Sequence, residues 1–134
     1  MHAISDLDTL LSSMRPVLNP GRFAFVTLTS GASLDLRLVV ASIREPEGLS
    51  VVLPEESALD LGLSVAFIAA WITLTVHSDL AAVGLTAAFS TAFGQAGVSC
   101  NVVAGTYHDH LFVPVEQAQM AMAVLHALQQ SAAA

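Results

Sequence analysis

Two long stretches of this chain contain no charged residue. Residues 61–78 and 80–108 hold no Asp, Glu, Lys or Arg. The first is long enough for a short membrane-spanning helix, but residues 72–76 read Ile-Thr-Leu-Thr-Val, and such alternation is typical of a strand. No Lys or Arg follows Arg44, so no positively charged loop sets a membrane topology. We therefore expect both stretches to be buried on several sides of a folded protein, in part against another subunit.

The few charged residues are mostly acidic. Eleven acids face four arginines and no lysine, which gives a formal net charge of −7. This composition argues against binding to nucleic acid, which needs clustered Lys and Arg, and against binding to an anionic membrane surface. Residues 1–14 carry two aspartates and no Lys or Arg, unlike a signal peptide. The single cysteine, Cys100, cannot form an internal disulfide, so we expect a cytoplasmic protein.

The spacing of apolar residues predicts an α+β protein. Predicted helices cover residues 4–14, 54–62, from Ser78 or Asp79 to about Ala96, and from Glu116 onwards. Predicted strands cover residues 23–29, 49–53, 68–77, 98–105 and 108–113, and residues 34–43 are either a strand or an irregular extended segment. From Ile68 onwards the order is β-α-β-β-α, which builds an antiparallel sheet with both helices on one face.

The two halves of the chain contain a short internal repeat. Residues 25–29 read Phe-Val-Thr-Leu-Thr and residues 71–75 read Trp-Ile-Thr-Leu-Thr, 46 positions later, and Leu34 and Leu80 keep the same offset. The repeat suggests two related sheet units. We predict a first unit over residues 1–64, with a helix followed by strands and a hairpin, and a second unit over residues 65–134, the two packed as one body.

The chain from about Arg22 to Leu128 resembles the ACT domain family, most specifically over residues 72–114. The likeness lies in the strand Ile72–Val76, the helix ending in Ala96-Gly97 and the strand Val98–Gly105. Residues 77–86 and 107–114 are similar to small free-standing bacterial proteins with two ACT-like units. The resemblance implies a ferredoxin-like sheet in tandem or composite units, side-by-side dimerisation, and amino-acid binding at an interface between units. It implies no catalysis and no cofactor.

Given that resemblance, the strongest ligand-site candidates lie where the second-half helix begins. A loop that enters a helix offers free backbone N–H groups to a carboxylate. Asp79 could accept an ammonium group, Gly84 would allow close approach, and Asn101 offers both a donor and an acceptor. Equally, Ser78 and Asp79 could be helix caps only. The predicted ligand-binding residues are Ser78, Asp79, Val83, Gly84, Leu85, Thr86, Asn101 and Val102.

A second cluster is the sequence His108-Asp109-His110. Residues two apart on a strand share a face, so both imidazoles could meet one metal ion, with His77 as a third ligand. A polar turn is the more ordinary interpretation, and we predict no metal site. Cys100 sits between apolar neighbours and is expected to be an inert thiol.

The sequence therefore predicts a non-catalytic, allosteric homodimer that binds a small amino acid or related metabolite. The alternative is a dimerisation module that docks on a partner enzyme without a ligand. A small metal-binding protein is the third and least favoured alternative.

Overall fold

The computed structural model describes residues 6–29, 32–76 and 83–133. Its helices are α1 (Leu7–Ser13), α2 (Glu55–Asp60), α3 (Leu85–Ala96) and α4 (Ala118–Ala133), with single 3₁₀ turns η1 (Leu36–Leu38) and η2 (Val115–Gln117). Its strands are β1 (Pro16–Leu18), β2 (Phe23–Leu28), β3 (Ala41–Glu45), β4 (Gly48–Pro54), β5 (Val65–Leu74), β6 (Asn101–Ala104) and β7 (Asp109–Pro114). The mixture of helices and an antiparallel sheet confirms the predicted α+β class.

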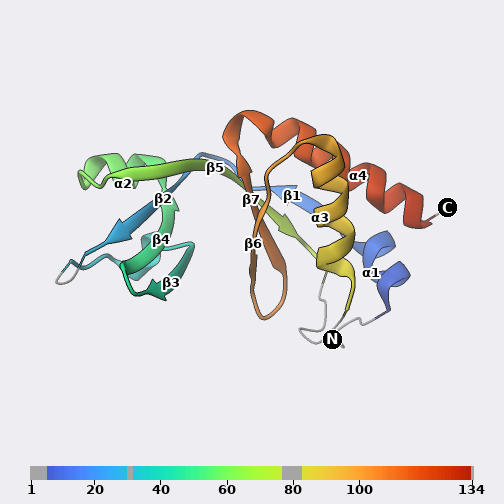
Figure 1. The fold of residues 1–134 in the computed structure, drawn as a ribbon, viewed down its shortest axis with the longest axis horizontal. Helices are drawn as coiled ribbons and strands as arrows, with labels where there is room; N and C mark the ends of the chain where they lie inside the picture. Colours follow the sequence, from blue (N-terminus) through green and yellow to red (C-terminus); the bar gives the residue numbers. More distant parts are fainter. Residues whose placement is uncertain (1–5, 30–31, 77–82, 134) are drawn as a thin grey trace.

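The seven strands form one sheet in the order β3-β4-β2-β5-β7-β6, and β1 also pairs with β5. Strand β5 is the longest. Its first part pairs with β2, and its last part lies between β1 and β7. We call β2, η1, β3, β4, α2 and the first part of β5 the first lobe, and the remaining elements the second lobe. Figure 1 shows the two lobes side by side, with β5 running from one into the other.

Each lobe has a β-α-β-β-α-β plan with one element altered. In the second lobe the chain runs through β5, α3, β6, β7 and α4, and β1 supplies the fourth strand from the N-terminal segment. In the first lobe the position between β2 and β3, which α3 occupies in the second lobe, holds only the turn η1. The boundary between the two units, predicted between residues 64 and 65, stays a prediction. The pairing of β1 with β5 joins residues 16–18 of the predicted first unit to the second lobe.

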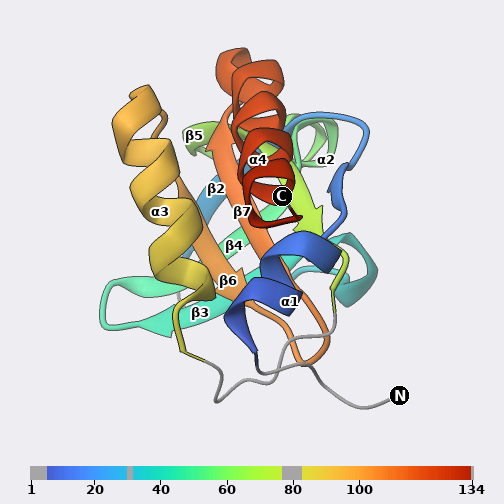
Figure 2. The ribbon, with the colours of Figure 1, turned by 90° about the vertical axis from the view of Figure 1, so that its right-hand side faces the viewer.

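The helices cover one face of the sheet. Alternate residues of β5, such as Ala70 and Ile72, pack against α1, α3 and α4, and Ile68 packs in the smaller cluster beneath α2. In Figure 2, α3 and α4 lie side by side and α1 crosses below them on the same side of the sheet. Helix α1 is capped by Asp6, whose carboxylate accepts a hydrogen bond from the Thr9 amide at 3.0 Å.

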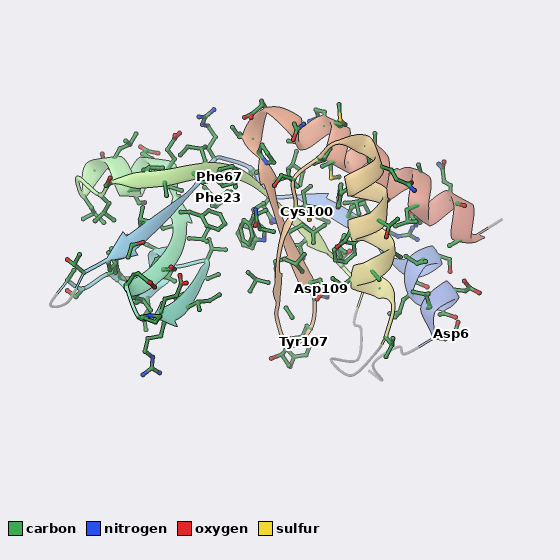
Figure 3. The ribbon with its side chains drawn as sticks, in the orientation of Figure 1. Asp6, Phe23, Phe67, Cys100, Tyr107 and Asp109 are labelled. Carbon is green, nitrogen blue, oxygen red and sulfur yellow. The ribbon has the colours of Figure 1, made fainter. Side chains whose placement is uncertain are left out.

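The other face of the sheet carries an aromatic cluster. Among the described residues no helix packs in this cluster; its members are Phe23, Phe25, Val40, Ala41, Val52, Phe67, Ala69, Trp71, Val103 and Phe112. Figure 3 shows the labelled rings of Phe23 and Phe67 close together near the junction of the lobes. Ala41 from β3 and Val103 from β6 line one small cavity of about 40 Å³, although these strands are the two ends of the sheet order. The sheet is therefore curved, and this face is its concave side.

The hairpin of β3 and β4 is formed as predicted. Glu45 pairs with Gly48 across the turn. Gly48 has a φ of +146°, and a Cβ there would lie 2.6 Å from the carbonyl oxygen of Leu28. Glycine is thus required at this turn because both the backbone angle and the space exclude a side chain.

Candidate functional site

The predicted ligand loop is only partly within the described residues. Ser78 and Asp79 lie outside them, as does His77. Helix α3 begins at Leu85, with Gly84 as its N-cap, so the predicted helix start at residue 78 or 79 is wrong. Val83 is 84% exposed, whereas Leu85 is buried in the core. Among the predicted ligand residues at the start of α3 that the structure describes, Val83 and Thr86 are exposed.

Gly84 makes room for helix α1. Its φ is +106°, and a Cβ at this position would lie 3.1 Å from Cδ2 of Leu7. The close approach that the sequence suggested for a ligand is therefore made by the N-terminal helix.

Asn101 and Val102 lie beyond the far end of α3 from Val83 and Gly84 within one chain. Asn101 pairs with Phe112, so it shares the concave face, whereas Val102 packs against the core beneath the helices. Strand β6 starts near the C-terminal end of α3 (Figure 1). Val83 and Gly84 instead precede the N-terminal end of α3. A joint site of these residues would need a second copy of the chain.

The histidine pair does not converge on a common point. The ring of His108 contacts the main-chain oxygen of Val76 at 3.3 Å. His110 instead turns its Nδ1 toward the Nε1 of Trp71, at 3.0 Å, and the Oγ1 of Thr73, at 3.2 Å. Within residues 6–29, 32–76 and 83–133, no group of three metal-ligating side chains is placed to hold an ion.

The hydrogen bonds around His110 fix its protonation state. The amide of Asn19 donates to Thr73 Oγ1 at 3.0 Å, which leaves the hydroxyl hydrogen of Thr73 free to donate to His110. The indole N–H of Trp71 can only donate, so Nδ1 of His110 accepts and its proton is on Nε2. Burial lowers the pKa of His110, His108 lowers it further, and Asp109 partly offsets both. The ring is therefore neutral at neutral pH.

This network predicts a pH-dependent stability. Because the pKa of His110 is lower in the folded than in the unfolded protein, the unfolded state binds more protons, and stability rises with pH in this range. The contribution should be complete above about pH 6.5 and should be lost as the pH falls through the lower, folded-state pKa. Urea unfolding between pH 5 and 8 should show a shallower pH dependence for His110→Gln than for the parent. Equal slopes for the two proteins would contradict this assignment.

Cys100 is a poor nucleophile in this fold. It packs at the edge of the second-lobe core, and burial raises the pKa of its thiol to about 11. The thiolate, which is the reactive form, is thus scarce at neutral pH.

A further cavity lies in the first lobe, on the helix-covered face. It has a volume of about 250 Å³ and is bounded mainly by aliphatic side chains from β2, β4 and the segment around η1; its lining residues are Leu28, Ala32, Ser33, Leu34, Leu36, Val39, Ser42, Leu49 and Val51. It exists because η1 stands where α3 covers the corresponding part of the second lobe.

The cavity adjoins a wider, charged depression at the hairpin. Leu28, Ala32 and Leu49 line both. The depression has a volume of about 500 Å³, and its further lining residues are Thr29, Arg44, Glu45, Pro46, Glu47 and Gly48. An apolar chamber with a charged mouth can hold a small molecule that has one apolar and one charged end.

The internal repeat could have indicated this cavity. Shifted back by 46 positions, the predicted ligand loop at residues 78–86 corresponds to residues 32–40. Five residues of that segment line the cavity. The predicted ligand residues lie only in the second half, where the likeness to the family is more specific.

Comparison with known proteins assigns the chain to a family. Two ACT domain families match it, one over residues 2–70 and the other over residues 67–127. The chain therefore belongs to the ACT domain family and contains two ACT-type units in succession. No curated protein gives a significant match.

Solved structures of other proteins share the fold of this chain. A Vibrio cholerae protein of unknown function, VC0802, described as a possible transport protein, is 48% identical, with a TM-score of 0.81 over 92% of this chain and 95% of that one. Protein Atu0741 from Agrobacterium tumefaciens is 15% identical, with a TM-score of 0.66 over 87% and 89%. The regulatory subunit of aspartate kinase from Thermus flavus is 10% identical, with a TM-score of 0.54 over 86% and 95%. The last two structures are similar to this chain in fold.

None of the described helices is long and apolar enough to span a membrane.

Proposed function

We propose that this chain is a non-catalytic regulatory protein that binds a small amino acid or related metabolite. The observation that carries the proposal is the first-lobe cavity, which adjoins a charged depression. The cavity is lined in part by residues 32–40, and the internal repeat aligns this segment with the predicted ligand loop at residues 78–86. Membership of the ACT domain family supports the regulatory part.

The proposed ligand site lies at an interface between two copies. Strand β3 is at one end of the sheet order, so its outer edge pairs with no other described strand. Ser42 and Arg44 of this strand line the cavity and its mouth. If two copies paired along β3, each mouth would border the partner chain. A ligand held there would shift the equilibrium between interface states, provided that it binds one state more tightly than the other.

The predicted second-lobe site remains part of the proposal. Val83 and Thr86 are exposed beside the start of α3, and Asn101 is exposed on β6, the other end of the sheet order. A loop of one copy and Asn101 of another could enclose a second ligand.

A thermal-shift panel of the twenty amino acids tests the proposal. A ligand held at 100 times its Kd should raise the free energy of unfolding by about 2.7 kcal/mol, and this should appear as a higher Tm. Sedimentation velocity of the same samples should show a homodimer. A flat panel at millimolar ligand would contradict ligand binding, and a flat panel together with one stoichiometric partner enzyme would favour a docking module instead.

A further inference from the structure

The first-lobe cavity is suited to a small aliphatic group. Its volume of about 250 Å³ is below the 300–1,000 Å³ that is usual for drug-sized ligands. Leu28, Val51 and Val39 contribute only hydrocarbon to its wall. An ionised side chain placed there would lose part of its hydration, and none of the lining residues offers it an opposite charge. The chamber therefore disfavours charged side chains such as those of lysine or aspartate.

The mouth contains an arginine that is not committed to an ion pair. Ion pairs among the described residues join Arg22 to Glu55 and Arg37 to Asp35, and Arg44 takes part in neither. Arg44 pairs with Leu49 across the β3–β4 ladder, and both residues line the depression. Its guanidinium is thus available at the charged end of the cavity.

The two glutamates of the hairpin, Glu45 and Glu47, differ in whether their carboxylates are free to bind a ligand. The carboxylate of Glu45 accepts a hydrogen bond from the hydroxyl of Ser50. Glu47 lies in the turn itself, lines the same depression as Arg44, and makes no ion pair with a described residue. An ammonium group beside a carboxylate bound to Arg44 would thus lie in the same depression as Glu47.

We propose that the first-lobe cavity binds an α-amino acid with an aliphatic side chain. Arg44 binds the ligand carboxylate, for which its planar guanidinium offers two parallel N–H donors. Glu47 binds the ammonium group, and the side chain enters the chamber between Leu28, Val39 and Val51. This assignment rests on the proposed function and specifies the ligand class and the residues that select it.

Titration calorimetry with the full chain tests the ligand class. Each buried methylene is worth roughly fourfold in affinity, so leucine should bind at least tenfold more tightly than alanine. Lysine and aspartate should bind at least tenfold more weakly than leucine. The 2-oxo acid of leucine keeps the carboxylate and the side chain but lacks the ammonium, and it should also bind at least tenfold more weakly. Equal binding of the oxo acid would overturn the assignment of an amino acid.

Variants of the mouth test the residues. Arg44→Gln should weaken leucine binding at least tenfold, because a charge-assisted bidentate contact is lost. Arg37→Gln is the matched control: this side chain is 90% exposed and already paired with Asp35, so affinity should change less than twofold. Glu47→Gln should weaken leucine more than it weakens the oxo acid, whereas an equal effect on both ligands would contradict the role of Glu47.

The outcomes separate this inference from the proposed function. If a polar or charged amino acid binds and Arg44→Gln has no effect, the inference is wrong while the proposed function stands. If no amino acid binds, both fail. Circular dichroism of each variant distinguishes lost binding from lost folding.

Ser42→Phe is a further test of the cavity. Ser42 is exposed and lines the cavity, so a phenylalanine there should abolish leucine binding by filling the chamber.

Discussion

Leu10→Ala should lower the free energy of unfolding by about 3 kcal/mol. Leu10 belongs to helix α1 and is fully buried. It packs in the second-lobe core with Phe89, Phe93 and Leu125, so truncation would leave a cavity among side chains of α3 and α4. Urea unfolding followed by circular dichroism gives this free energy.

The matched control is Leu59→Ala in helix α2. Leu59 is 64% exposed, and leucine and alanine are both good helix formers, so this change should cost less than about 0.5 kcal/mol. If the two variants lost equal stability, α1 would not be an integral part of the second-lobe core. That result would also weaken the assignment of β1 as the fourth strand of that lobe.

Elements with a strong local pattern could be predicted from the sequence. The alternation at residues 72–76 predicted the second half of β5, and the hairpin predicted in the first unit is present as β3 and β4. Gly97 ends α3 with a φ of +73°, as the sequence indicated. These signals are local because they arise from backbone angles and side-chain periodicity.

Long-range features could not be predicted in this way. Strand β1 has three residues, begins with proline, and pairs with residues 72–74 of β5. Nothing in so short a segment specifies a partner more than fifty positions away. The first-lobe cavity was missed for a related reason: it depends on the single turn η1 standing where a full helix covers the other lobe. The internal repeat points to the segment that lines the cavity but does not show that the helix is missing there.

Phe112→Ala should cost about 4 kcal/mol, although no described helix packs over this side chain. Phe112 is fully buried on the concave face, where its ring lies 5.5 Å from that of Phe25 and 6.4 Å from that of Trp71. Phe112→Leu, which keeps much of the volume, should cost less than half as much. A loss below about 1 kcal/mol for the alanine variant would mean that the concave face contributes little to the core.

The mode of unfolding should also reveal how the lobes are joined. Strand β5 belongs to both lobes, and Phe25 of the first lobe contacts Phe112 of the second. We therefore expect the parent protein and Phe112→Leu to unfold in one transition, with fluorescence of Trp71, the single tryptophan, coinciding with circular dichroism. Two separate transitions in the parent would show that the lobes fold independently, because the shared strand and aromatic cluster would then fail to couple them.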